Sequence, residues 1–416
     1  MITAIRQQLP RHPAARALAV ASFVDWMGTG VWLTTSVLFL VETVGLGPAD
    51  IGVGLGIAGV LGMLAVIPVA DLTRRWPAGR VAVLLQVARG LAFLSYLAVV
   101  DAGTFFVAAA LVGVTDRPAI TVNQIVVARV IPQEERNGTM AAAHVAQNLG
   151  ITIGALLGTV ALLRTDRAVF VAVVVVNAVT YLLAAWLLAR TVWRRDAEIA
   201  APEPARAGTV RTLLAALRDW RFTLLAAGNG LLALHVPLLT VAIPLWLAQA
   251  TDVPPAAMGA LLIVNTALVV LFQVPLARPV RSVTDGVRAA WVGAAFLIAC
   301  CAALALSPLP PVPVAAGLLL LAAALQTMGE IQQNAAGWAL SFNRAPADHR
   351  QSTYLGLFGT GQTAVILLGP TLLTFLIGSL GAVSFAATAA LFLVGALCVT
   401  IGAAGSAAAQ PYSPGR

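Results

Sequence analysis

The sequence predicts an all-α membrane protein with twelve transmembrane helices, arranged as two homologous six-helix halves. Three observations predict this fold class. Hydrophobic residues make up 60% of the 416 residues and charged residues only 10%, whereas a soluble globular domain carries about 25% charged residues. The apolar residues form runs long enough to cross a bilayer. The chain also repeats itself at long range, as membrane proteins built from two related halves do.

The repeat is visible in two pairs of short segments. Pro132-Gln-Glu-Glu-Arg136 recurs 214 positions later as Pro346-Ala-Asp-His-Arg350, each before a Gly-rich apolar run. Pro68-Val-Ala70 recurs at an offset of 207 as Pro275-Leu-Ala277. An offset of about half the chain indicates that the second half of the protein is a copy of the first.

Six apolar runs precede the most polar stretch of the chain. Each is at least 20 residues long, which is enough for a helix to span the hydrocarbon core. The predicted spans are Ala17–Val41, Ile51–Ala70, Val81–Val100, Thr104–Ala128, Thr139–Leu163 and Val169–Ala189.

Six further runs follow that stretch, with lengths from 18 to 29 residues. They complete the second half, and the boundaries of all twelve are predicted to within a few residues. The spans are Phe222–Ala248, Ala256–Ala277, Ala289–Leu306, Val314–Phe342, Thr353–Ile377 and Ala382–Gly402. We therefore expect an N-terminal half over residues 1–190, a linker over 191–220, a C-terminal half over 221–404 and a tail over 405–416.

The basic residues predict the topology. All 25 are arginine, and 21 of them lie before the first span, in every second connection or at the end of the chain. Only Arg164 and Arg167 lie in the opposite set of connections. By the positive-inside rule, both termini and the central linker are cytoplasmic. The expected location is the bacterial cytoplasmic membrane.

Several classes of function are excluded by composition. The absence of lysine rules out a P-loop lysine or a Schiff-base lysine. The net charge of +8 is spread over short connections, which predicts contact with anionic lipid heads and no nucleic-acid partner. The four histidines are scattered and the three cysteines lie in apolar runs. We therefore expect no metal, no cofactor and no enzymatic activity.

A glycine pattern in the second span resembles a nucleotide-binding motif only as a string of letters. Gly54-Leu-Gly56-Ile-Ala-Gly59 has the spacing of the dinucleotide fingerprint, but it lies within a span instead of between a strand and a helix. We expect Gly52, Gly56 and Gly59, which share one helix face, to let a neighbouring helix approach closely.

Ionisable residues inside the predicted spans indicate a working site. Asp25, Asp116, Arg117 and Glu330 lie within apolar runs, and Asp116 falls on Glu330 at the repeat offset of 214. A charge at the centre of a spanning helix costs about 2.5 to 3.5 kcal/mol, so these four would cost roughly 10 to 14 kcal/mol if they faced lipid. They must face water, one another or a ligand. Arg89, also inside a span, is expected to have a structural partner.

Two spans carry polar stripes that suit a solute. In the tenth, Glu330, Gln333 and Asn334 share one face with Trp338 beside them, and in the first, Asp25 shares a face with Trp32. Acids, amides and tryptophan together favour a bulky amphiphilic or cationic molecule over a sugar. We expect Trp32, Gln333, Asn334 and Trp338 to bind substrate.

Two motifs resemble those of the major facilitator superfamily. Val69-Ala-Asp71 with Arg74, Arg75 and Gly79 is similar to the Gly-x-Leu-Ala-Asp-Arg-x-Gly-Arg-Arg motif between its second and third helices, although Ile67 replaces the first glycine. The resemblance implies that Asp71, Arg74 and Arg75 latch the two halves in the outward-facing state. Topology-setting charges are the alternative reading of these residues.

The second motif is similar to that of the proton-coupled drug antiporters. Their fifth helix carries Gly-x-x-x-Gly-Pro-x-x-Gly-Gly, and here Gly150, Gly154 and Gly158 keep the spacing without the proline and the last glycine. The Gly-Pro pair stands instead in the eleventh span, at Gly369-Pro370. The resemblance implies a role for these glycines in conformational switching, whereas tight helix packing in any transporter is the alternative.

The resemblance also implies that the two six-helix halves are arranged around a central cavity, which the first, fourth, seventh and tenth helices line. Asp25, Asp116 with Arg117, His235 and Glu330 lie in those four spans. We expect them to carry or relay protons, with Glu330 or Asp116 as the carrier. A structural ion pair remains the alternative for Asp116 and Arg117, and packing the alternative for His235. Arg117 stands near the fourth-helix arginine of the family, but Pro118-Ala119 follows it in place of Gln-Gly.

The predicted function is proton-coupled antiport that exports hydrophobic or cationic small molecules. The alternatives are a proton-coupled importer of a small metabolite and a membrane sensor that transports nothing. The expected partners are the substrate, protons and membrane lipid, and the protein is expected to be a monomer.

Overall fold

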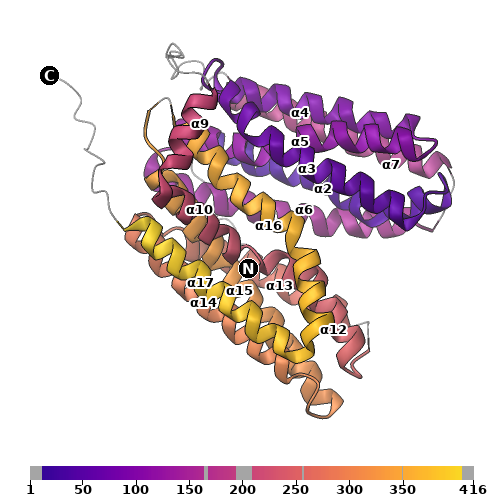
Figure 1. The fold of residues 1–416 in the computed structure, drawn as a ribbon. Coiled ribbons are helices and arrows are strands. Elements are labelled where there is room, and N and C mark those ends of the chain that lie inside the picture. The colour runs from indigo at the N-terminus through magenta and orange to yellow at the C-terminus, as the bar shows by residue number, and fades with distance from the viewer. Residues whose placement is uncertain (1–11, 164–166, 194–208, 255–256, 349, 405–416) are drawn as a thin grey trace.

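The fold is a pair of helical bundles that diverge from a common junction, like the arms of a V (Figure 1). The computed structural model describes residues 12–163, 167–193, 209–254, 257–348 and 350–404. In this part of the chain there is no strand. Eleven segments are long and apolar enough to cross a membrane, and the last of them contains two helices. The twelve predicted spans are therefore present, with ends within about six residues of those predicted.

The N-terminal bundle contains six long helices. They are α2 (Pro13–Glu42), α3 (Pro48–Leu72), α4 (Ala78–Leu94) with the short η1 (Ser95–Ala98), α5 (Ala102–Val130), α6 (Gln133–Ala161) and α7 (Arg167–Leu188), which continues into η2 (Ala189–Trp193). A short helix, α9 (Thr209–Arg218), lies in the predicted linker.

The C-terminal bundle contains the other six spans. They are the broken helix made of α10 (Trp220–Leu232), α11 (His235–Pro237), η3 (Leu238–Ala242) and α12 (Ile243–Ala250), followed by α13 (Ala257–Ala277), α14 (Val283–Leu306), α15 (Val312–Arg344), α16 (Gln351–Leu380), η4 (Gly381–Val383) and α17 (Ser384–Ala403). The predicted tail over 405–416 and residues 194–208 of the predicted linker lie outside the described residues.

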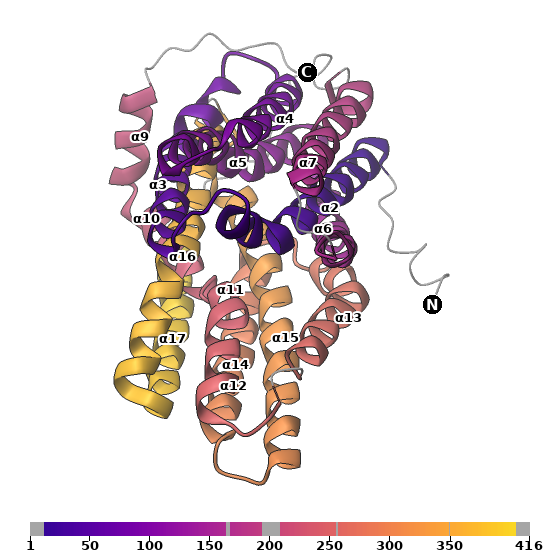
Figure 2. The same ribbon diagram turned by 90° about the vertical axis from the view of Figure 1, so that its right-hand side faces the viewer.

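Helices of the two bundles pack against each other at the junction. There α3 and α5 contact α16, and α6 contacts α13 and α15; Figure 2 shows α6 beside α13. Hydrogen bonds join the arginine-bearing connections across the junction: Gln133 Nε2 donates to Asn343 Oδ1 at 3.0 Å, and Asn137 Nδ2 donates to the carbonyl of Val280 at 2.5 Å. The arms therefore join at the end that carries most of the arginines.

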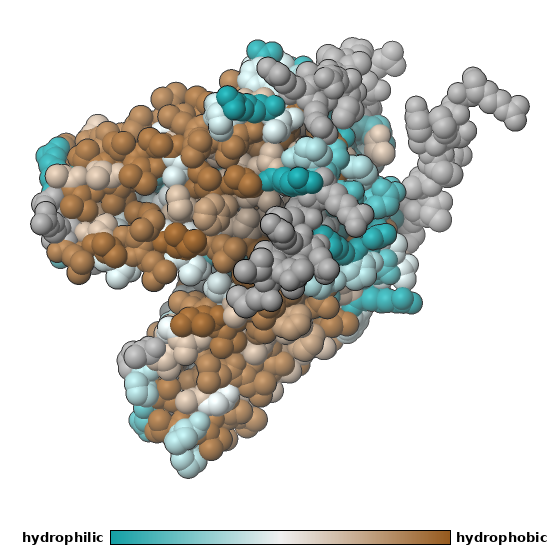
Figure 3. Space-filling model, turned by 180° about the vertical axis from the view of Figure 1, so that it is seen from behind, coloured by the Kyte–Doolittle hydropathy of each residue, from teal (hydrophilic) through white to brown (hydrophobic). Residues whose placement is uncertain are grey.

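Hydropathy is distributed as a membrane requires. On the face shown in Figure 3, apolar side chains cover the length of both arms, and hydrophilic residues gather where the arms meet and at their free ends. Exposed large hydrophobic residues occur on helices of both bundles, for example Leu64, Leu156, Ile263 and Phe375. Such outer surfaces are stable against lipid tails and not against water.

Of the three glycines that were expected to let a neighbouring helix approach, Gly59 does so, since a Cβ atom there would lie 2.5 Å from Leu367 Cδ1 of α16. A Cβ atom on Gly52 or Gly56 would meet nothing within 4 Å, so the expectation that these two glycines bring a neighbouring helix close is wrong. The close approach to α5 lies on another face of α3, where a Cβ on Gly62 would lie 2.7 Å from the carbonyl oxygen of Gly113. No feature of the sequence distinguishes Gly62 from Gly52 and Gly56, so the sequence could not predict which of these glycines lies at the contact with α5.

The seventh span is broken in the middle. Proline lacks the backbone N–H that continues a helix, and Pro237 lies at the end of α11, where a π-helical turn begins. Gly369 of α16 packs against this break, since a Cβ atom there would lie 2.6 Å from Pro237 Cγ. The next residue, Pro370, lies inside α16, which changes direction along its length (Figure 1).

Candidate functional site

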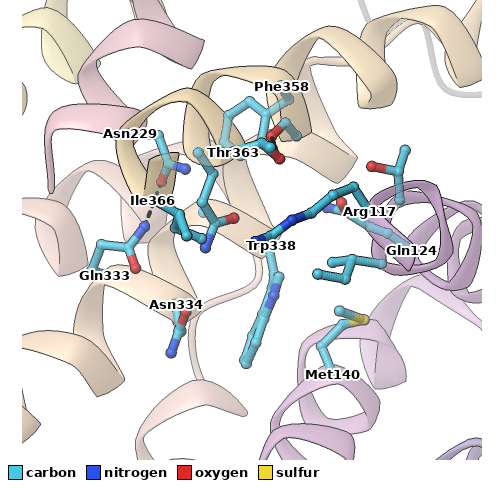
Figure 4. A pocket seen from close by; sticks show the side chains of 15 residues that line it. Arg117, Gln124, Met140, Asn229, Gln333, Asn334, Trp338, Phe358, Thr363 and Ile366 are labelled. Carbon is cyan, nitrogen blue, oxygen red and sulfur yellow. Dashed lines mark hydrogen bonds between the residues drawn. The ribbon is translucent and has the colours of Figure 1, made fainter. Parts of the chain in front are cut away.

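A polar pocket lies between the two bundles, close to the junction (Figure 4). Helices of both halves line it, as expected for a site that alternating motions of the halves would open and close. Its lining residues are Arg117, Ile120, Thr121 and Gln124 of α5, Met140 of α6, Asn229 of α10, Gln333, Asn334, Gly337 and Trp338 of α15, and Phe358, Gly359, Gln362, Thr363 and Ile366 of α16.

The predicted face of α15 forms one wall of this pocket. Gln333, Asn334 and Trp338 all line it, because residues three and four apart share a face of a helix. Gln333 Nε2 donates to Asn229 Oδ1 of α10 at 3.0 Å. Gly337 makes room for that contact, since a Cβ atom there would lie 2.8 Å from Asn229 Oδ1. Three of the four predicted substrate-binding residues are therefore brought together.

The fourth, Trp32, lies elsewhere. Its ring packs within the N-terminal bundle against Phe93 and Tyr96, with centroid distances of 4.8 and 4.6 Å. Such aromatic contacts stabilise a bundle interior. The structure does not bring Trp32 to the pocket, because the turn of α2 that carries it faces α4 and α7.

Glu330 joins the two halves. It is buried in the middle of α15, and its Oε1 lies 3.1 Å from Nε2 of His144, which belongs to α6 of the other half. Asn265 Nδ2 of α13 donates to Oε2 at 3.2 Å, and Gln326 Nε2 donates to the same oxygen at 3.4 Å. Three donors from three helices thus converge on one carboxylate, which compensates for its burial.

His235 extends this network toward the pocket. Its Nε2 lies 3.1 Å from Gln333 Oε1, and its backbone carbonyl accepts from Gln326 Nε2 at 3.2 Å. The chain of hydrogen bonds therefore runs from Glu330 through Gln326 and His235 to Gln333, which lines the pocket. A network of this kind can transmit a change in charge at Glu330 to the pocket wall.

A second cluster of buried charges lies inside the N-terminal bundle. Arg89 of α4 bonds to Asp25 Oδ2 of α2 at 2.5 Å and to Asp116 Oδ1 of α5 at 2.6 Å. Gln86 Nε2 also donates to Asp25 Oδ2, at 2.8 Å. The guanidinium carbon lies 4.2 Å from the centroid of the Tyr181 ring. Arg89 therefore has the structural partner that was predicted for it, and Asp25 faces this arginine instead of the pocket.

Asp116 and Arg117 point in different directions, as adjacent helix positions do. The Asp116 side chain reaches Arg89 and remains 37% exposed, whereas the Asp25 side chain is only 6% exposed. Arg117 lines the pocket and has no hydrogen bond or ion pair within the described part of the chain. The two residues therefore do not pair with each other, and they belong to different sites.

The predicted latch residues lie at the junction end of α3. Arg74 Nη1 donates to Asp71 Oδ1 at 2.9 Å and both side chains are buried, whereas Arg75 is exposed. One turn earlier, α3 packs against α16 of the other half: a Cβ atom on Gly356 would lie 3.5 Å from Ala70 Cβ. Asp71 and Arg74 are thus adjacent to a contact between the halves.

The glycines of the predicted antiporter motif form a tight crossing of α6 with α2. A Cβ atom on Gly150 would lie 2.5 Å from the carbonyl oxygen of Phe23, one on Gly154 would lie 3.0 Å from Gly30 Cα, and one on Gly158 would lie 3.0 Å from Thr34 Cβ. The obstacles are largely backbone atoms, which cannot move aside. These three glycines therefore all lie where two helices of the same bundle pack closely.

Sequence reasoning missed several residues of the network. His144 is not among the predicted site residues, although it lies one turn from Asn148 in the span that carries the glycine motif. Asn265 and Gln326 are amides in apolar runs, and the contacts that they make with other helices are not disclosed by the sequence. Among the described residues, no group of three or more His, Cys, Asp or Glu side chains could hold a metal ion.

Comparisons with known proteins agree with this architecture. The family model of the Major Facilitator Superfamily matches residues 18–370. Two solved structures are similar at 14% sequence identity. One is the human organic anion transporter MFSD10 (TETRAN), with a TM-score of 0.66 over 93% of this chain and 99% of that one. The other is a bacterial homologue of the iron transporter ferroportin in an outward-facing state, with a TM-score of 0.70 over 94% and 97%. No curated protein matches the sequence.

Proposed function

This chain belongs to the Major Facilitator Superfamily, and from that premise we propose that it is a proton-coupled antiporter that exports hydrophobic or amphiphilic small molecules. In this proposal the pocket between α5, α15 and α16 binds the substrate. Glu330 binds the proton, and the two bundles rock about the pocket so that it opens to one side of the membrane at a time.

The observation that carries the proposal is the place of Glu330 between the halves. As a carboxylate it accepts hydrogen bonds from His144 of one half and from Asn265 and Gln326 of the other. Protonation removes its charge and part of its capacity to accept hydrogen bonds, so the bridge to His144 weakens. A proton on Glu330 would then change the relative stability of two arrangements of the halves, which is what coupling requires.

The direction in which the cavity opens follows from the proposed topology. If the arginine-bearing ends are cytoplasmic, as the positive-inside rule predicts, the arms join on the cytoplasmic side and diverge toward the outside. The conformation is then outward-facing. We propose that Asp71 and Arg74 stabilise this closed cytoplasmic side, because they adjoin the contact of α3 with α16.

Export is favoured by a resemblance in α6, whose glycine spacing is similar to that of proton-coupled drug antiporters. In this structure the same glycines provide the close contact with α2. The pocket wall fits an amphiphilic substrate, since Trp338, Phe358 and Ile366 offer apolar surface between amides. Membrane location, action as a monomer and cytoplasmic termini complete the proposal.

One observation favours a second candidate, a proton-coupled importer of a small metabolite. Arg117 places a positive charge in the pocket without a neighbouring carboxylate among the lining residues. An anion bound there would be stabilised further when Glu330 loses its charge, and a proton and an anion that favour each other's binding move in the same direction.

Growth tests separate the two candidates. A host stripped of its own efflux pumps would express the wild-type chain or the Glu330→Gln variant and would be exposed to a panel of hydrophobic compounds. The antiporter predicts protection by the wild type and its loss in the variant. Uptake of a labelled metabolite without protection would favour the importer. If no substrate-dependent proton movement occurred in liposomes, the membrane sensor that transports nothing would be the remaining candidate.

A further inference from the structure

The described part of the pocket lining carries a positive charge that no acidic lining residue balances. Among the fifteen described residues that line the pocket, Arg117 is the only one with a formal charge. The others are amides, hydroxyls, glycines and apolar side chains. None of these described residues is an aspartate or glutamate, so the lining places no carboxylate beside the guanidinium.

The two nearby acidic residues, Asp116 and Glu330, contact side chains other than Arg117. Asp116, the sequence neighbour of Arg117, bonds to Arg89 inside the N-terminal bundle at 2.6 Å. Glu330 lies against His144 and Asn265. Arg117 itself has no ion pair or hydrogen bond to any residue that the structure describes. A guanidinium in the middle of a membrane protein is costly unless something compensates its charge.

Arg117 is positioned to meet a ligand. It extends from α5 into the pocket toward Trp338 of α15 (Figure 4). Guanidinium presents a planar set of donors that matches the two oxygens of a carboxylate or of another oxyanion. Amide groups of Gln124, Asn334 and Gln362 line the same space and can donate to such a group. Trp338, Phe358 and Ile366 supply apolar surface for the remainder of the molecule.

We propose that the transported substrate is an amphiphilic organic anion whose carboxylate or equivalent oxyanion binds to Arg117. This inference rests on the proposed function only in taking the pocket as the transport site. Of the two candidates it favours the importer, because a proton on Glu330 and an anion at Arg117 would stabilise each other's binding. An organic cation would have to approach Arg117 without any carboxylate in the pocket to offset the repulsion, so the geometry disfavours the cationic substrates that the sequence suggested.

A matched set of probes tests the charge preference directly. Binding of 2-naphthoate, 2-naphthamide and 2-naphthylmethylammonium to the purified full chain would be measured by calorimetry at one pH. The three share an aromatic skeleton and differ in charge. We expect the wild type to bind the carboxylate at least tenfold more tightly than the amide, and the ammonium most weakly.

Variants assign that preference to one residue. Arg117→Gln should bind the carboxylate and the amide equally, and Arg117→Lys should retain part of the preference because it keeps the charge and loses the planar donors. Arg167→Gln is the matched control, since it removes an exposed arginine at the start of α7 and should change nothing. Tighter binding of the ammonium by the wild type, or a carboxylate preference that persists in Arg117→Gln, would overturn the inference.

The test is independent of proton coupling because no gradient is applied. A charge preference that depends on Arg117, together with the absence of substrate-driven proton movement, would refute the proposed function alone. Proton movement with a substrate that binds without regard to Arg117 would refute the inference alone.

Discussion

Arg89 binds two acidic side chains and so determines where they lie in the N-terminal bundle. It holds carboxylates from two other helices, Asp25 and Asp116, and its own side chain is only 6% exposed. From sequence, the two acids and the arginine were three separate charges in three spans. Their convergence is a property of how α2, α4 and α5 pack, which the sequence does not disclose.

We predict that Arg89→Gln destabilises the protein by about 3 to 5 kcal/mol, because breaking a buried ion pair leaves an uncompensated charge. Thermal unfolding in detergent would show the loss as a lowered midpoint. Adding Asp25→Asn should restore part of the stability, since it removes one of the two carboxylates that Arg89 balances. Unfolding of the single variant at the wild-type temperature would mean that the cluster adds nothing to stability.

His144 differs from Arg89 because its partner lies in the other half of the protein. The resemblance directed attention to the first, fourth, seventh and tenth helices, and His144 lies on the fifth span. A histidine in an apolar run gives no sign of facing an acid 186 positions away. Glu330 itself was predictable, since a lone carboxylate in a spanning helix requires a reason.

Among the elements, the helices were predictable and their irregularities were not. The apolar runs fixed all twelve spans, because the length of a run is set by the thickness of the membrane. The break between α10 and α12 was missed, since Pro237 and Pro244 stand in an otherwise continuous run and prolines are tolerated in spanning helices. That break matters for the site, because it places His235 at the start of α11.

The crossing of α2 with α6 provides a test at this scale. Gly154→Ala would place a Cβ atom 3.0 Å from Gly30 Cα and against the backbone of Met27, so the two helices must separate. Overpacking of this kind typically costs about 1 to 3 kcal/mol, which thermal unfolding would report.

Gly56→Ala is the matched control for this crossing. It makes the same chemical change in α3, where a Cβ atom would meet nothing within 4 Å. Alanine there should be neutral or slightly stabilising, because it restricts the unfolded chain and favours helix. Equal effects of the two substitutions would show that the α2–α6 crossing is not held by close contact.

Considered as a whole, the molecule is two bundles joined at one end, and in the proposed function the contacts at that end stabilise the arrangement that is open on the other side. Asp71→Asn removes the charge that Arg74 contacts at 2.9 Å, next to the packing of α3 on α16. We predict slower turnover with equilibrium substrate affinity within about threefold of the wild type, a difference near 0.7 kcal/mol. Transport rates and binding calorimetry on the same preparation would check this. Lost affinity with unchanged switching would refute the assignment.

The two-halves architecture was predictable from the long-range repeat, but the chemical difference between the halves was not. Asp116 and Glu330 occupy corresponding positions, 214 residues apart. In the structure the first is paired with an arginine of its own bundle, whereas the second faces a histidine of the other bundle. The repeat in the sequence therefore identified two corresponding acids. The packing of the helices shows that Glu330 is the one that contacts the other half.

The central claim, that Glu330 couples protons to the motion of the halves, is tested most directly in proteoliposomes under an imposed pH gradient. The substrate would be the naphthyl probe that binds most tightly to the wild type. Gln keeps the size and hydrogen bonding of Glu330 but fixes the neutral form. We predict that Glu330→Gln lets the probe equilibrate down its own gradient yet abolishes pH-driven accumulation, while Asp116→Asn is affected less. Full pH-driven accumulation by Glu330→Gln would contradict the account and would move the proton carrier to Asp116 or Asp25.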